Sequence, residues 1–274
     1  GIDYQIDKND FSFLINNEKI KFDFAYITIH GTPGEDGRLQ GYFDMIGIPY
    51  STCGVTAAAL TFNKYICNNY LKNFDVKVAK SVLLKNKSGY DLSEIGESLK
   101  YPLFVKPNLG GSSFATTKVK NIESFQQAVN LAFDEANEVV IEQFIGGVEV
   151  TCGCYKIQNK TVFFPLTEVV TGNDFFDYKA KYEGQVEEIT PARISEDLST
   201  FIQQETSRIY DLVGAKGIIR ADYIISDDIP FLLEVNTTPG MTPTSFIPQQ
   251  IKAASLDIKD VLTEIIESEY QKDK

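Results

Sequence analysis

Two apolar segments late in the chain, Gly217–Ile225 and Phe231–Val235, flank a polar turn at Ser226–Pro230. Apolar runs rich in β-branched residues, bounded by turn residues, predict a β-hairpin. The many aliphatic neighbours in both segments indicate a central, buried hairpin. The alternative is a surface hairpin whose acidic residues are solvated.

Polar side chains recur at every second position on both predicted strands. Alternation places Arg220 on one face with Asp222, and Glu234 on one face with Asn236. A hairpin symmetric about Asp228 sets Asp222 opposite Glu234 and Arg220 opposite Asn236. Opposed like charges repel, and a buried, unpaired carboxylate is costly. Oxygen ligands of this kind suit Mg²⁺, so the hairpin predicts a magnesium site that leaves room for phosphate.

Periodicity along the rest of the chain predicts an alternation of strands and helices, and so an α/β or α+β fold. No internal repeat is visible. The predicted strands are residues 11–15, 19–22, 23–29, 76–84, 101–107, 139–144, 149–155 and 163–169. The predicted helices are residues 39–46, 57–71 and 197–213, and a last helix through residues 258–265. Thr56 caps the second of these, and Asn121 caps a further predicted helix.

Glycine-rich loops follow two of the predicted strands. His30 begins the first (HGTPGEDG), where α/β folds place ligands, and is either a polar strut of the loop or a substrate contact. The second, residues 108–113 (NLGGSS), can turn backbone N–H groups toward phosphate. No Walker A loop and no G-x-G-x-x-G fingerprint occurs.

Two lysines differ in their surroundings. Lys106 lies inside an apolar strand, where lysine needs a partner, and we expect an anion rather than a simple salt bridge. Lys64 lies on a helix, where a lone lysine is usually solvated. Glu142 is embedded in another strand, and residues 171–185 read as an excursion of the length typical of lids.

Composition narrows the function further. The chain has 274 residues, 43% hydrophobic and 23% charged, with a formal net charge of −12, which argues against non-specific nucleic-acid binding. No apolar run approaches a membrane span, and no signal peptide is seen. The single histidine excludes multi-histidine zinc sites, and the four cysteines suit buried free thiols. We expect a cytoplasmic protein without nucleic-acid or membrane partners.

Strand lysine, Gly-Ser loop and carboxylate hairpin together describe a phosphate site, which suits phosphoryl transfer. Five segments then resemble the D-alanine–D-alanine ligases of the ATP-grasp fold over nearly the whole chain. They are IHGTPGEDGRLQGYFDMIGIPYSTCGVTAAALTFNK, PLFVKPNLGGSS, DYKAKY, GIIRADY and LLEVNTTPGMTPTS.

The resemblance implies two α+β subdomains that enclose ATP, residues 53–142 and 143–274, preceded by a truncated N-terminal Rossmann-like α/β domain, residues 1–52. It also implies a homodimer. The implied reaction joins two D-alanine molecules for peptidoglycan synthesis through a D-alanyl phosphate, which a closed lid protects from water.

The resemblance also implies a role for each candidate residue. The implied ATP contacts are Lys64, Lys106, Glu142, Glu149 and Lys181. The implied ligands of two Mg²⁺ ions, which Mn²⁺ can replace, are Asp222, Glu234 and Asn236. Arg220 and the backbone of Gly240 would stabilise the oxyanion, Ser245 would bind the second D-alanine and His30 would lie near the first. Ser112 and Tyr182 would link the Gly-Ser loop to the lid.

Two departures from the family pattern are visible. Ala115 stands where the family's loop usually has a further glycine, and the family's first strand would lie before Gly1. If that segment is absent, we expect ATP binding with poor or no ligation, a catalytically impaired nucleotide-binding protein. The other alternative is a ligase that joins D-alanine to D-lactate or D-serine.

Overall fold

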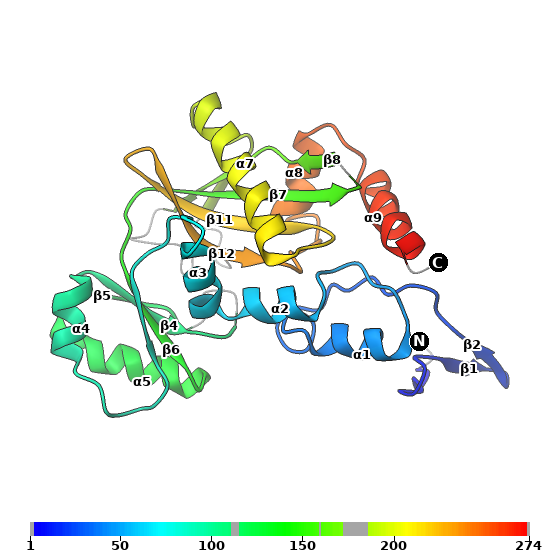
Figure 1. The fold of residues 1–274 in the computed structure, drawn as a ribbon, viewed down its shortest axis with the longest axis horizontal. Helices are drawn as coiled ribbons and strands as arrows, with labels where there is room; N and C mark the ends of the chain where they lie inside the picture. Colours follow the sequence, from blue (N-terminus) through cyan, green and yellow to red (C-terminus); the bar gives the residue numbers. More distant parts are fainter. Residues whose placement is uncertain (1–2, 111–114, 159, 172–185, 273–274) are drawn as a thin grey trace.

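The computed structural model describes residues 3–110, 115–158, 160–171 and 186–272 (Figure 1). They form an N-terminal portion and two antiparallel sheets, each with its own hydrophobic core. Among the helices of these ranges, none has the length and apolar character needed to cross a membrane.

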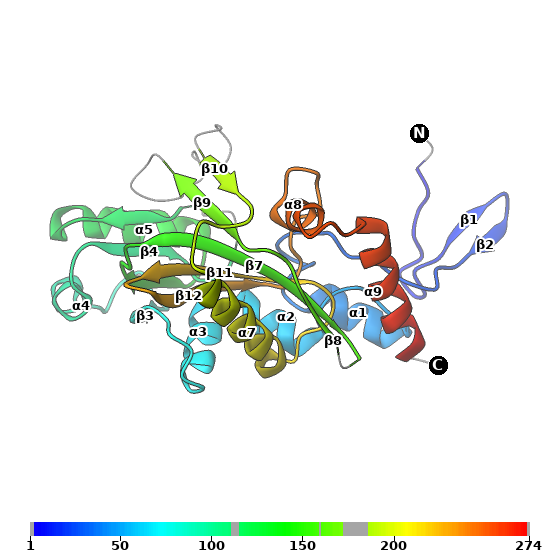
Figure 2. The same ribbon diagram turned by 90° about the horizontal axis from the view of Figure 1, so that it is seen from above.

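The N-terminal portion begins with a hairpin of β1 (Phe13–Ile15) and β2 (Glu18–Ile20), which projects from the body in both views (Figures 1 and 2). Asn16 and Asn17 form its turn with positive φ angles of 52° and 68°, which asparagine tolerates. Helix α1 (Arg38–Ile46) follows and ends at Gly47, as predicted.

The strand predicted for residues 23–29 is wrong. This segment forms a single parallel bridge, between Ala25 and Tyr50, and Ile29 is 49% exposed. Ala25 N–H donates to Pro49 O (2.9 Å) and Ser51 N–H donates to Ala25 O (3.1 Å). In the described residues no strand continues this pairing, so the apolar run is extended backbone packed over α1.

The single helix predicted for residues 57–71 is two helices, α2 (Val55–Phe62) and α3 (Lys64–Lys72). Asn63 separates them with an extended backbone (φ −92°, ψ 101°) and bridges to Leu109. This long-range pairing interrupts the apolar pattern, and it makes Lys64 the first residue of a helix.

The smaller sheet has the strand order β3-β6-β4-β5. Its strands are β3 (Ser81–Leu84), β4 (Leu103–Pro107), β5 (Thr117–Val119) and β6 (Val139–Gln143). Helices α4 (Leu92–Leu99) and α5 (Phe125–Glu135), the second preceded by a 3₁₀ turn (Ile122–Ser124) that Asn121 caps, cover one face. Lys106 and Glu142 therefore lie on the face without helices.

The larger sheet has the order β10-β9-β7-β11-β12, with β8 also paired to β7. Its strands are β7 (Val148–Ile157), β8 (Lys160–Phe163), β9 (Thr167–Thr171), β10 (Val186–Ile189), β11 (Ile219–Ser226) and β12 (Ile229–Asn236). Helix α7 (Glu196–Val213) packs on one face, and α8 (Phe246–Ala253) and α9 (Ile258–Lys272) pack on the other (Figure 2).

The strand predicted for residues 163–169 is also wrong in part. Here β8 and β9 pair with opposite ends of β7, with the register shifting by one residue between Phe163 and Thr167. Phe164 and Leu166, in the interruption, are buried in two different cores.

The two sheets meet at β12. Leu232 forms a parallel bridge with Val78, just before β3, and its N–H donates to Lys77 O (2.8 Å). This link brings the open face of the smaller sheet beside the hairpin of β11 and β12.

Candidate functional site

The hairpin of β11 and β12 has the predicted opposition. Arg220 pairs with Asn236 and Asp222 pairs with Glu234 in the antiparallel register. The turn is shorter than expected, because Asp227 and Asp228 alone form it, with positive φ angles of 50° and 62°. Two positive φ angles are typical of the tight turn that matches strand twist.

A β-bulge at Leu233 brings Glu234 to the face of Asp222. Tyr223 pairs with Leu232, whereas Asp222 pairs with Glu234, so Leu233 is the additional residue. Its carbonyl accepts a hydrogen bond from Asn68 Nδ2 of α3 (3.2 Å). Leu232 and Val235 consequently both face the apolar core, while Glu234 and Asn236 face the site.

Arg220 and Asn236 both hold Asp222. Arg220 binds the carboxylate through two hydrogen bonds, from Nε to Oδ1 and from Nη2 to Oδ2, each 2.8 Å. Asn236 Nδ2 also donates to Oδ2 (3.0 Å). Burial disfavours the charge of Arg220, but Asp222, Glu234 and Glu149 outweigh it and raise the pKa of the guanidinium. Arg220 therefore keeps its positive charge beside the Asp222 carboxylate.

Glu234 gathers positive charge from both sheets. Burial alone would raise the pKa of its carboxyl group, but Lys64, Lys106 and Arg220 outweigh burial and lower it to about 2. The nearest of these is Lys64, whose Nζ lies 3.3 Å from Glu234 Oε2. Lys64 Nζ also donates to Gly110 O (2.6 Å). Lys64 is thus a largely buried, paired lysine and not a solvated helix lysine.

Lys106 has a protein partner. Its Nζ lies 2.7 Å from Glu142 Oε2, and both side chains are nearly buried. Lys106 thus forms a salt bridge with another candidate site residue, and the expectation of an anion in place of a salt bridge is wrong for this structure. Because Lys106 also lowers the pKa of Glu234, its charge acts on the larger sheet as well.

His30, Gly240 and Ser245 form a second group beside the hairpin. A Cβ atom built on Gly240 would lie 2.6 Å from Ser245 Oγ and 3.9 Å from His30 Nε2. His30 Nδ1 lies 3.5 Å from Glu35 Oε1, so the histidine is held by its own loop. Ser245 Oγ lies 2.8 Å from Thr242 Oγ1. Both roles considered for His30, strut and substrate contact, fit this position.

Phe246 joins the two groups and was missed by sequence reasoning. It is the first residue of α8, directly after Ser245, and the Arg220 guanidinium lies 5.1 Å from its ring centroid. An aromatic residue following the candidate serine at the start of a helix was the available signal, but no helix was predicted for residues 246–253.

The remaining candidates divide into two kinds. Glu149 lies on β7 opposite Ile224, and its charge helps to raise the pKa of Arg220, so it belongs to the same face. Ser112, Lys181 and Tyr182 lie outside the described residues, as does most of the predicted lid.

The hairpin supplies oxygen donors that fit a hard cation. Asp222 and Glu234 place carboxylate oxygens in opposed positions, the lowered pKa of Glu234 keeps its carboxylate charged, and the Asn236 amide carries a third oxygen. Within the described ranges, no group of three His, Cys, Asp or Glu side chains is arranged for a metal ion. Two carboxylates with one amide leave several coordination positions for water or phosphate, which is typical of Mg²⁺.

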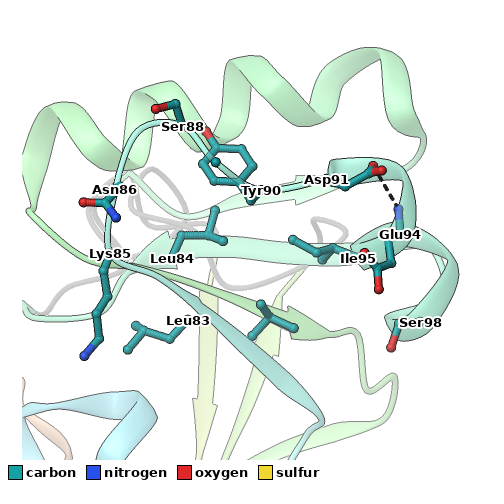
Figure 3. Close-up of a pocket in the computed structure, with 12 residues that line it drawn as sticks. Leu83, Leu84, Lys85, Asn86, Ser88, Tyr90, Asp91, Glu94, Ile95 and Ser98 are labelled. Carbon is teal, nitrogen blue, oxygen red and sulfur yellow. Dashed lines mark hydrogen bonds between the residues drawn. The ribbon is translucent and has the colours of Figure 1, made fainter.

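A separate pocket of about 490 Å³ lies between the end of β3 and the start of α4 (Figure 3). Figure 3 shows Asp91 accepting a hydrogen bond from the N–H of Glu94. Asp91 thereby caps the start of α4. None of the candidate site residues lines this pocket.

Two family descriptions match this chain. Residues 4–53 match "D-ala D-ala ligase N-terminus" and residues 70–267 match "D-ala D-ala ligase C-terminus". A curated "D-alanine--D-alanine ligase" of Parabacteroides distasonis is 65% identical over 270 residues, which are 98% of this chain and 82% of that protein.

Solved structures give the same result. The VanG D-Ala:D-Ser ligase of Enterococcus faecalis is 33% identical with a TM-score of 0.85, covering 97% of this chain and 79% of that one. The D-alanine–D-alanine ligase of Bacillus anthracis complexed with ATP is 28% identical with a TM-score of 0.79, covering 92% and 80%. The fold is therefore the predicted ATP-grasp fold, and the chain belongs to the D-alanine–D-alanine ligase family.

Proposed function

We propose that this chain joins two D-alanine molecules into D-alanyl-D-alanine, with ATP converted to ADP and phosphate. The observation that carries the proposal is the position of Glu234, which meets lysines of α3 and β4 and shares a face with Asp222 and Asn236. Membership of the ligase family supports the choice of substrates.

The nucleotide end of the site is built by lysines from two elements. Lys64 and Lys106 would release Glu234 and Glu142 and turn toward the ATP phosphates. Glu142, so freed, would reach the adenine, and Glu149 the ribose. Asp222, Glu234 and Asn236 would hold Mg²⁺, or Mn²⁺ in its place. The bound metal ion would neutralise negative charge on the phosphates.

The two D-alanine molecules would bind where the loop that begins at His30 meets the loop that contains Gly240 and Ser245. Ser245 Oγ, which now bonds Thr242 Oγ1, would donate to the second D-alanine carboxylate, and His30, across Gly240, would lie near the first. Arg220, stacked on Phe246, and the N–H of Gly240 would stabilise the negative oxygen of the tetrahedral intermediate. Ser112, Lys181 and Tyr182 keep their predicted lid and phosphate roles as part of this proposal.

The chemistry balances in two steps. The carboxylate of the first D-alanine attacks the γ-phosphorus, the bond from that phosphorus to the β-γ bridging oxygen breaks, and ADP leaves. The amine of the second D-alanine then attacks the acyl carbonyl, loses a proton, and phosphate leaves as the peptide bond forms. Exclusion of water at the second step prevents hydrolysis of the acyl phosphate.

A D-alanine–D-serine ligase is the second candidate, because the VanG relative is described as a D-Ala:D-Ser ligase. A ligase that joins D-alanine to D-lactate is a further alternative.

The homodimer, the cytoplasmic location and the domain boundaries after residues 52 and 142 also stay predictions.

The test is ADP release by the chain with ATP and Mg²⁺, measured with and without D-alanine. We expect release that depends on D-alanine, with the dipeptide as product. Competition of D-serine and D-lactate against D-alanine, at neutral and low pH, decides among the ligase types. An equal rate of ADP release with and without D-alanine would contradict the proposal.

A further inference from the structure

Asn108, directly after β4, is fully buried, and each of its polar groups has a hydrogen-bond partner in the protein. Its Nδ2 donates to Asn63 Oδ1 (3.0 Å) and to Glu138 Oε2 (2.7 Å). Its Oδ1 accepts from the N–H of Tyr65 (2.9 Å), and its carbonyl accepts from the N–H of Lys64 (3.2 Å). Its own N–H donates to Glu138 O (2.9 Å).

These contacts cap helix α3 from a distant part of the chain. The first N–H groups of a helix have no partner within it. In α3, Asn108 takes the N–H groups of Lys64 and Tyr65, and Asn63 Oδ1 takes that of Ile66 (2.9 Å). The helix start is thus fixed by β4 and by the residue before β6, which are elements of the smaller sheet.

The capped residue is the lysine that reaches the larger sheet. Lys64 is the first residue of α3, and its Nζ lies between Glu234 Oε2 (3.3 Å) and Gly110 O (2.6 Å). Gly110 follows Asn108 by two residues, so one buried amide fixes both the backbone of Lys64 and the start of the glycine-rich loop.

We propose that Asn108 is a positioning residue. By capping α3 from a distant part of the same chain, it orients Lys64 toward the nucleotide phosphates. This inference rests on the proposed function, since it assumes that Lys64 binds nucleotide. It adds a residue that makes its contribution without touching the nucleotide itself.

The first test replaces Asn108 with leucine, which has nearly the same size and no polar atoms. Loss of a cap costs about 1 kcal/mol, so the Kd for ADP with Mg²⁺, measured by calorimetry, is expected to rise about fivefold to tenfold. The KM for D-alanine is expected to stay within about twofold, because the group around Ser245 is untouched.

A second pair of variants serves if Asn108→Leu does not fold. Asn108→Asp keeps the acceptor for Tyr65 but sets a carboxylate against Glu138, which should weaken ADP binding. Adding Glu138→Gln restores a donor at that contact and should recover a large part of the lost affinity. Rescue by a residue remote from the nucleotide is not expected of a purely local packing defect.

Thr206→Val is the matched control for lost stability. Thr206 is fully buried; its Oγ1 donates to Ile202 O within α7 (2.8 Å) and bonds Tyr223 Oη of β11 (2.8 Å). The substitution should lower the melting temperature without a selective change in ADP affinity.

Three results would overturn the inference: a folded Asn108→Leu protein with unchanged ADP affinity, an Asn108→Asp effect that Glu138→Gln fails to reduce, or a rise in the KM for D-alanine as large as the rise in the Kd for ADP. Failure of the unsubstituted chain to bind ADP would instead count against the proposed function.

Discussion

Glu234 is the residue at which the charges of the two sheets balance. Its carboxylate faces Lys64, Lys106 and Arg220, and these cations hold its pKa at about 2 against the effect of burial. Removing the charge would leave three cations facing one another around Asp222. Neutral glutamine keeps the shape of the side chain, so it separates the effect of charge from that of packing.

We expect Glu234→Gln to abolish turnover, lowering kcat by about a hundredfold or more, while the fold stays intact. D-alanine-dependent ADP release measures the loss, and circular dichroism checks the fold. The matched control is Glu264→Gln on α9, which keeps an acceptor for Tyr155 Oη and should leave turnover unchanged. Substantial activity in Glu234→Gln would mean that the metal-site assignment is wrong.

The lowered pKa of Glu234 also predicts a pH dependence of stability. Because the folded-state pKa lies below the ordinary value of 4.5, the ionised group stabilises the fold fully above about pH 4.5. That contribution is lost as the pH falls toward about 2. Urea unfolding of the wild type and of Glu234→Gln should therefore give free energies that differ at pH 7 and converge progressively as the pH falls from about 4.5 to about 2. A constant difference would refute the shift.

At the scale of elements, α8 is fastened tightly to the larger sheet. Gln250 is fully buried, and its Nε2 donates to Thr151 O (3.0 Å) on β7 and to Thr167 Oγ1 (3.1 Å) on β9. A Cβ atom on Gly153 would lie 2.5 Å from Ile247 Cδ1, so the helix rests directly on the backbone of β7. Ser245 and Phe246 owe their positions to this packing.

We expect Gln250→Met to destabilise the protein by about 1–3 kcal/mol, because two acceptors lose a buried donor. The KM for D-alanine should rise while the Kd for ADP stays the same, since only the helix that follows Ser245 is loosened. Chemical denaturation and steady-state kinetics measure the two effects. Gln126→Met, on the exposed face of α5, is the control and should change stability by less than about 0.5 kcal/mol. Equal effects of both variants would exclude a special role for Gln250.

Elements could be predicted where a local pattern determined them. Gly47 and Gly214 end helices α1 and α7 in the left-handed conformation, as expected from sequence. The break at Asn63 could not be predicted, because it depends on pairing with Leu109, 46 positions further along the chain. For the same reason the cap from Asn108 was missed, although both Lys64 and the glycine-rich loop were candidates.

The hairpin shows that a correct prediction can rest on an incomplete reason. Symmetry about Asp228 was assumed, yet the turn is centred between Asp227 and Asp228, and the bulge at Leu233 supplies the missing shift. No local signal for that bulge was recognised, since its carbonyl is satisfied by Asn68 from α3.

At the scale of the whole molecule, the site depends on two sheets with separate cores. The smaller sheet contributes Lys106 and Glu142, and the larger sheet contributes Glu234. In the part of the chain that the structure describes, the bridge from Val78 to Leu232 and its neighbouring hydrogen bond pair the backbones of the two sheets. A nucleotide held by both sheets would therefore add a second link between them.

We expect ADP with Mg²⁺ to slow hydrogen exchange in β4 and β6 as well as in β11. At a hundred times its Kd, the ligand should add about 2.7 kcal/mol to the free energy of unfolding. Lys106→Met combined with Glu142→Gln removes the ion pair without leaving a lone buried charge, and should fold but lose this gain. Protection confined to the larger sheet would contradict a nucleotide site that spans both.

The additional residue at Leu233 has a consequence for engineering. If β12 were straightened into a regular ladder, for example when the hairpin is grafted onto another scaffold, Glu234 would pair with Ala221 and turn inward among aliphatic side chains. The resulting protein would fail to fold rather than lose activity by degrees. A transplanted hairpin must therefore carry Asn68, or another donor for the Leu233 carbonyl, along with its own two strands.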